Sequence, residues 1–195
     1  MGKKNKRINR DTDVHDEETI RQRREGKLLL LTRKQIVTRI LDTAAMLWLG
    51  DADPISIHIL ACVAHQNLHK IATKQGADRL NLKVATGWED IYSAYNDLKH
   101  STGDPNHRDQ FVVENNEIML FDCIRCFGNI FAWRSPWMNT FAGYIMIHCD
   151  FVKANDPPDE VLPGVRISEV INLSRKAFVE KMYPIFVDAH KRGFH

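Results

Sequence analysis

Residues 32–54 decide the fold, and they read TRKQIVTRILDTAAMLWLGDADP. From Ile36 to Trp48 the apolar side chains recur every three or four positions, which is the spacing of one buried face of an α-helix. Thr32 and Gln35 have the spacing of a capping box, and Gly50 ends the apolar pattern. The stretch therefore predicts a helix over about 32–49.

The same kind of signal continues along the chain. Asp53 and Pro54 can open a second helix, which we expect to end near Gln75, because Asp is a good N-cap and Pro is tolerated in a first turn. A capping box over 86–89 predicts a third helix that ends near Gly103. Further helices are predicted over 118–131, over 135–149 and from about Ser168, with Pro184 kinking or interrupting the last.

Two segments do not have a helical pattern. Residues 110–114 look extended, and residues 154–164 are expected to form a loop because they are rich in Pro, Asn, Asp and Gly. The predicted fold class is therefore all-α, a single-domain bundle of five or six helices.

Length and composition also fit one folded domain. The chain has 195 residues, and 44% of them are hydrophobic, which is enough for a substantial core. Residues 1–27 contain nine Lys or Arg against six acids and few apolar side chains, so we expect a disordered charged tail ahead of a domain over 28–195. Such a tail is either a solubilising segment or a weak phosphate-binding arm.

The formal net charge is only +2, so the overall charge does not indicate binding to nucleic acid or to a membrane. No apolar stretch has the position of a secretory signal or the length of a membrane span. We therefore expect a soluble, cytoplasmic protein with no membrane partner and with reduced cysteines.

Two groups of side chains have the composition of a metal site. Cys123 and Cys126, with His148 and Cys149, could supply four zinc ligands. The Cys pair falls inside an apolar helical pattern, however, where cysteine usually behaves as a small hydrophobic residue.

The second group lies on the second predicted helix. His58, Cys62, His65 and His69 fall on one stripe beside its apolar face. The plainer interpretation buries His58 with a hydrogen-bond partner and leaves His65 and His69 solvated. We predict no metal and no cofactor.

The third predicted helix ends in a polar cluster. Asn96 and His100 are one turn apart, Lys99 lies beside them, and the turn at Asp104 follows. Such a cluster could bind an anion or move a proton, which makes Asn96, Lys99 and His100 candidate catalytic residues. His58 and Asp104 are candidate ligand-binding residues. In the plainer interpretation Asn96 and His100 only close the end of the helix.

Two motifs carry a resemblance to known proteins. Asp53-Pro54-x-x-x-His58-x-Leu60-x-x-x-Ala64 together with Asn96-x-Leu98-Lys99-His100-x-x-x-Asp104-Pro105 resembles a group of small uncharacterised bacterial helical proteins over about residues 30–150. The second motif is also similar to the signature of HEPN domains, helical bundles of prokaryotic toxins and defence proteins. Many of these are metal-independent RNases whose active site forms where two protomers meet.

The HEPN resemblance implies that His100 matches the catalytic His and that Asn96 matches the polar residue after the catalytic Arg. Tyr95 stands where that Arg would be, and a phenol lacks the charge and the fork of donors of a guanidinium. The resemblance therefore implies a homodimer that acts on RNA, or an inactive relative that binds RNA or a partner. The alternative is a non-enzymatic protein-interaction or structural module.

Overall fold

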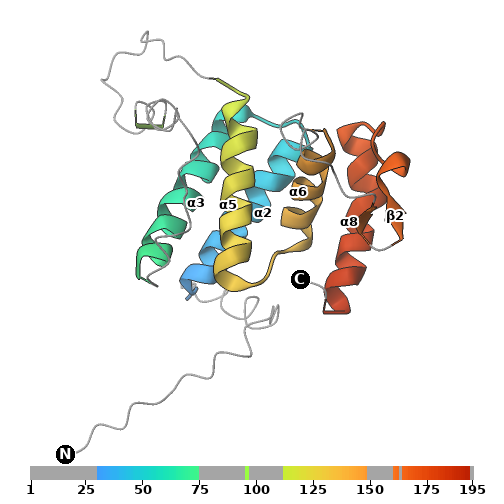
Figure 1. Cartoon of the computed structure of the whole chain (residues 1–195). Helices are drawn as coiled ribbons and strands as arrows, with labels where there is room; N and C mark the ends of the chain where they lie inside the picture. Colours follow the sequence, from blue (N-terminus) through green and yellow to red (C-terminus); the bar gives the residue numbers. More distant parts are fainter. Residues whose placement is uncertain (1–29, 75–94, 97–111, 149–159, 163, 194–195) are drawn as a thin grey trace, which may run out of the picture. The chain divides into compact units, whose positions relative to one another are not determined.

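Helices make up most of the described chain. The computed structural model describes residues 30–74, 95–96, 112–148, 160–162 and 164–193. The chain divides into two compact units, Met1–Thr32 and Arg33–His195, and only residues 30–32 of the first are described. In the second unit the α-helices are α2 (Arg33–Leu49), α3 (Pro54–Lys74), α5 (Asn115–Phe131), α6 (Pro136–His148) and α8 (Arg175–Lys191), as Figure 1 shows. The fold is all-α, as the sequence predicts.

Local signals set the starts of these helices. The Asp53 carboxylate accepts hydrogen bonds from the backbone N–H of Ser56 at 2.8 Å and from its hydroxyl at 2.6 Å, so Asp53 is the N-cap of α3 as predicted. The Ser135 hydroxyl accepts from the backbone N–H of Met138 at 3.2 Å at the start of α6. Ser174 caps α8 in the same way, accepting from Ala177 N.

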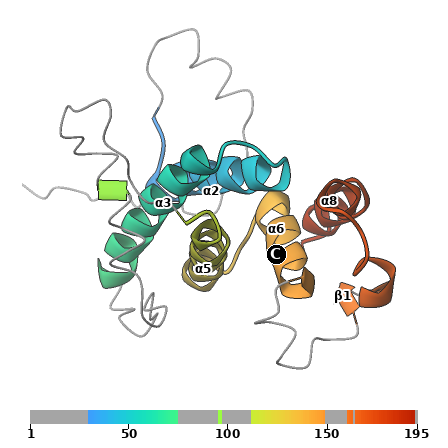
Figure 2. The same ribbon diagram turned by 90° about the horizontal axis from the view of Figure 1, so that it is seen from above.

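The contacts between helices fix their relative directions. α2 and α3 form an antiparallel pair, joined by a short turn in which Asp51 has a positive φ of 58°. α5 runs parallel to α3, because Asn116 contacts Pro54 near the start of both helices and Cys123 contacts Ala61 further along. The order of the helices can be followed in Figures 1 and 2.

α6 turns back from α5 through Ala132, which is in the left-handed region with φ 49°. α8 then runs antiparallel to α6. Trp137, near the start of α6, stacks on Tyr183 with ring centroids 4.0 Å apart, and Tyr144, further along α6, meets Phe178 edge-on at 5.3 Å.

The buried apolar side chains form two clusters. The larger one joins α2, α3, α5 and α6 and includes Leu41, Leu68, Phe127 and Phe141 at 0% exposure. The smaller one joins the end of α6 to α8 through Ile147, Val170, Phe178 and Met182. The aromatic side chains of α5 and α6 are therefore used mostly as core.

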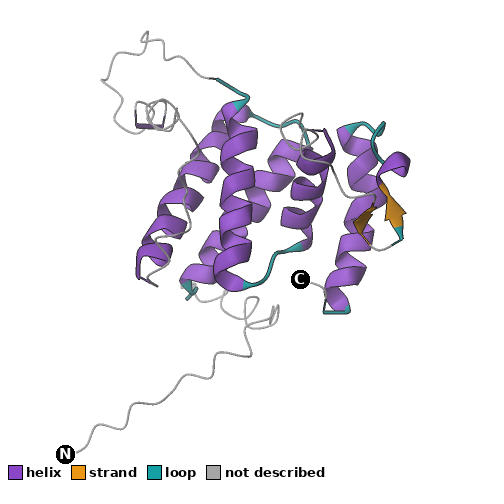
Figure 3. Ribbon diagram, in the orientation of Figure 1, coloured by secondary structure: helices purple, strands orange, loops and turns teal. Residues whose placement is uncertain are grey.

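Two sequence expectations about non-helical segments need correction. A loop was expected over residues 154–164, of which the structure describes 160–162 and 164. In that part Glu160–Leu162 (β1) pairs with Val165–Arg166 (β2) as a short antiparallel hairpin, drawn in orange in Figure 3. Gly164 beside the turn has φ 85°, a conformation that glycine adopts without strain. Residues 112–114, expected to be extended, instead lead into α5 through a turn.

The last helix also differs from the expectation. Residues Ile167–Glu169 form a single 3-10 turn, and α8 begins only at Arg175, after its Ser174 cap. Pro184 lies inside α8 without interrupting it. Its side chain is exposed, so the backbone beside the missing N–H can be hydrated.

The predicted tail over 1–27 and most of the predicted third helix lie outside the described residues. None of the helices that the structure describes combines the length and the apolar character needed to cross a membrane.

Candidate functional site

The structure describes one of the three candidate catalytic residues. Asn96 lies in a helical segment with its side chain exposed, and the preceding Tyr95 is only 9% exposed and belongs to the larger core cluster. Lys99, His100 and Asp104 lie outside the described residues. Position 95, which would carry the catalytic Arg of a HEPN domain, therefore faces the core.

His58 is part of a buried hydrogen-bond network between α3 and α5. It is 1% exposed, and its Nδ1 lies 2.9 Å from Oδ1 of Asn116, which is also 1% exposed. The Asn116 Nδ2 donates to the Pro54 carbonyl oxygen at 2.8 Å. His58 Nε2 lies 3.5 Å from the Cys62 thiol. The network satisfies polar groups that would otherwise be costly to bury.

The network also fixes the tautomer of His58. A carbonyl oxygen can only accept, so the contact with Pro54 identifies the donor end of the Asn116 amide and leaves Oδ1 as the acceptor toward His58. His58 Nδ1 therefore carries the proton and donates to Asn116 Oδ1, while Nε2 faces the Cys62 thiol. This arrangement holds helices together, in agreement with the plainer interpretation of His58.

His65 was expected to be solvated, and that expectation is wrong. Its side chain is 7% exposed, because α3 turns this position against the bundle. Burial, with a smaller effect from the nearby His69, lowers the pKa of His65 to about 4. His69 is exposed, as expected.

The described cysteines are buried thiols. Cys62, Cys123 and Cys126 are free, and Cys123 Sγ lies 3.6 Å from the Ala61 carbonyl oxygen. Burial raises the pKa of Cys62 to about 12 and that of Cys126 to about 11, so both are thiols at neutral pH. Across the described ranges, no three His, Cys, Asp or Glu side chains gather closely enough to hold a metal ion.

A pair of arginines near the end of α5 is a feature that the sequence did not indicate. Arg125 donates to Asp122 Oδ1 from Nε at 3.1 Å and from Nη2 at 2.6 Å. The Arg134 side chain lies over Gly128, where a Cβ atom would collide with its guanidinium. Burial and the positive charge of Arg125 lower the pKa of Arg134. Within the described part of the chain, Arg134 has no carboxylate partner.

Neither arginine stands out in the sequence, since each is a single basic residue in an apolar context. Only the turn at Ala132 brings Arg134 back along α5. No protein-family model, curated protein or solved structure matches the chain.

Proposed function

We propose that the protein is a non-catalytic RNA-binding module of HEPN-like type that works in the cytoplasm as a homodimer. The observation that carries the non-catalytic part is the burial of Tyr95 in the larger core cluster. A HEPN-type RNase needs a guanidinium at this position to stabilise the phosphate, and a core-facing phenol supplies neither the positive charge nor the fork of N–H donors. Asn96 remains exposed beside it.

The RNA part of the proposal rests on the motif that ends in Lys99 and His100. RNA binding without cleavage needs cations and hydrogen-bond donors, and it does not need an activated nucleophile.

The test is incubation of the purified full-length protein with a mixed RNA pool, with and without EDTA, beside a His100→Ala variant. We expect intact RNA in every lane and a retarded protein–RNA band at low salt. Cleavage that survives EDTA and disappears in His100→Ala would overturn the non-catalytic part. Absence of a retarded band at about 50 mM salt would overturn the RNA part.

A second candidate is a non-enzymatic protein-interaction or structural module. It is favoured by His58, whose contacts with Asn116 and Cys62 are used to join α3 and α5. Exposed apolar side chains on the same two helices, Ile55, Ile59 and Ile118 at 42%, 38% and 47% exposure, could serve a protein partner. This candidate predicts no RNA retention at any salt concentration. Light scattering of the purified chain tests the homodimer independently of RNA.

A further inference from the structure

The ends of the five helices divide into two groups with different charge. Arg33 Nη1 in α2 donates to Asn67 Oδ1 in α3 at 3.1 Å. Lys34 Nζ lies 5.5 Å from the Phe131 ring centroid and 5.3 Å from that of Trp133. The Trp133 ring in turn meets His190 of α8 edge-on at 5.5 Å. The start of α2 and the ends of α3, α5 and α8 therefore lie together.

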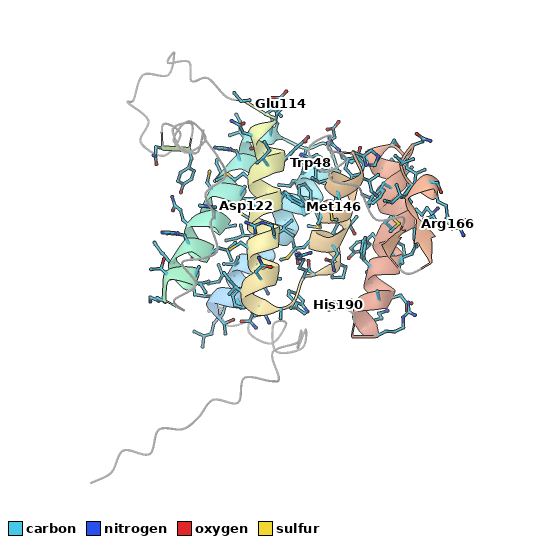
Figure 4. The ribbon with its side chains drawn as sticks, viewed as in Figure 1. Trp48, Glu114, Asp122, Met146, Arg166 and His190 are labelled. Carbon is cyan, nitrogen blue, oxygen red and sulfur yellow. The ribbon has the colours of Figure 1, made fainter. Side chains whose placement is uncertain are left out.

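We call this group the basic end and define it as residues 33–42, 65–74, 122–135 and 183–193. It contains nine Lys or Arg and three Asp, a formal excess of six positive charges. The opposite halves of α2, α3, α5 and α8, with the turns beside them (residues 43–64, 112–121 and 174–182), contain five acids and three Lys or Arg, an excess of two negative charges. Figure 4 marks Glu114 and His190, which belong to the two different ends.

The acids of the basic end are already engaged. Asp122 is paired with Arg125, Asp188 with Arg192, and Asp42 accepts from the Ser135 hydroxyl. Seven cations have no carboxylate partner among the described residues, namely Arg33, Lys34, Arg39, Lys70, Lys74, Arg134 and Lys191. Carboxylates of the described residues therefore do not neutralise the positive charge of this end.

Helix dipoles do not account for this concentration of charge. Three helix C-termini at the basic end carry about −0.5 charge each and two N-termini carry about +0.5 each, which sums to far less than the excess of cations. Arg33 and Lys34 occupy the first turn of α2, where the dipole disfavours a cation and where no acid is present. The interaction of these two cations with the helix dipole is unfavourable, and a nearby anion would offset it.

We propose that the basic end is the surface on which the protein binds the phosphate backbone of RNA. This inference rests on the proposed function and locates the RNA on the basic end of the bundle. The Arg125 and Arg134 pair is the most structured part of the surface. Gly128 has no side chain, so the Arg134 guanidinium lies close against α5, within electrostatic reach of Arg125. The Arg134 guanidinium, which has no carboxylate partner among the described residues, suits a phosphate group.

The experiment measures binding of a fluorescein-labelled single-stranded RNA of about 20 nucleotides to the full-length protein by fluorescence anisotropy, over about 50–200 mM salt. The test variant combines Lys70→Gln, Lys74→Gln and Lys191→Gln, all at exposed positions of the basic end. The matched control combines Arg166→Gln, Lys176→Gln and Lys181→Gln, which removes the same charge elsewhere. Circular dichroism checks that both variants keep their helices.

We expect the test variant to lose at least about tenfold in affinity at about 0.1 M salt and to lower the salt slope by about 2, since each single-strand phosphate contact contributes about 0.7. The control should lose much less. If the wild type binds RNA and the two variants bind equally well, the basic end is the wrong surface and the proposed function stands. If the wild type does not bind RNA, the proposed function itself fails, and this inference fails with it.

A second variant separates position from charge. Gly128→Ala leaves the net charge unchanged and suits a helix, yet its Cβ would displace the Arg134 guanidinium. We expect Gly128→Ala and Arg134→Gln to weaken RNA binding several-fold and by similar factors. If both variants bind RNA with wild-type affinity, the two arginines do not belong to the binding surface.

Discussion

Asn116 joins two parallel helices that have no short connection between them. Its amide accepts from His58 and donates to the Pro54 carbonyl, and the side chain is 1% exposed. An apolar side chain at this position could pack in the same space but would leave both polar groups without these bonds. The cost of losing a buried partner is larger than the net gain of an average hydrogen bond.

Asn116→Ala should therefore lower the free energy of unfolding by about 1–3 kcal/mol. Urea denaturation followed by circular dichroism measures the loss. Asn129→Ala is the matched control, because Asn129 lies on the same helix with an exposed side chain and should change stability little. Equal effects from the two substitutions would contradict the role assigned to Asn116.

His65 makes the stability of the protein depend on pH. Burial lowers its pKa to about 4, below the ordinary value near 6.5, so the unfolded chain binds more protons than the folded one between these values. Stability should therefore fall as the pH drops below about 6.5 and level off near pH 4.

Between pH 7.5 and pH 5, wild-type protein should lose about 2 kcal/mol of unfolding free energy that a His65→Leu variant does not lose. Urea titrations at the two pH values give the difference. His69→Gln should keep most of the wild-type pH dependence, because its side chain is exposed and burial is the main cause at His65. Parallel pH profiles for wild type and His65→Leu would show that His65 is not the responsible group.

At the scale of the helices, two serines cap in similar ways but differ in what else they contact. Ser174 accepts from Ala177 N at the start of α8 and is exposed. Ser135 accepts from Met138 N at the start of α6, is 3% exposed, and also donates to the Asp42 carboxylate of α2. One cap is local to its helix, and the other links two helices.

Ser174→Ala should cost about 1 kcal/mol of unfolding free energy, the usual value for a lost N-cap. Ser135→Ala should cost about 1–2 kcal/mol more, since a buried hydrogen bond to a charged group is lost together with the cap. Side-by-side urea curves decide between the two values. Equal losses would show that the bond to Asp42 adds nothing.

At the scale of the whole molecule, the distribution of charge matters more than the net charge. The formal net charge of the chain is only +2, yet the basic end holds six more positive than negative charges. Like charges on one surface repel each other, and salt screens this repulsion over about 10 Å at 0.1 M. The wild type should therefore become more stable as salt rises from a low concentration.

Arg33→Gln combined with Arg39→Gln should raise stability at about 10 mM salt by a few tenths to about 1 kcal/mol, and the gain should disappear near 1 M. The control pair, Arg166→Gln with Lys176→Gln, should give no gain, since Arg166 lies near Glu169. Thermal unfolding at several salt concentrations provides the comparison. A loss of stability from the first pair at low salt would contradict the repulsion at the basic end.

The sequence predicted the helices better than it predicted the contacts of single residues. The starts of α3 and α6 follow from capping side chains within four residues of each helix terminus, and such signals can be read without the fold. The strand pair around Gly164 and the delayed start of α8 escaped prediction, because strands this short have no periodicity to detect.

The candidate site shows the same division. The sequence suggested that His58 would find a partner, but Asn116 is 58 residues away and is not marked by any local pattern. The burial of His65 was missed because His65 lies at the border of the apolar face of α3. Only the packing of α3 against the other helices decides whether such a border position is buried or exposed.

By itself the sequence determined that the protein is all-α and where most of its helices lie, because capping and helical periodicity depend on neighbours in the chain. The tertiary structure alone decided that Tyr95 faces the core, that His58 meets Asn116, and that cations from four helices and a turn share one end. These features depend on which helix ends meet, and that is set by the packing of side chains far apart in the sequence.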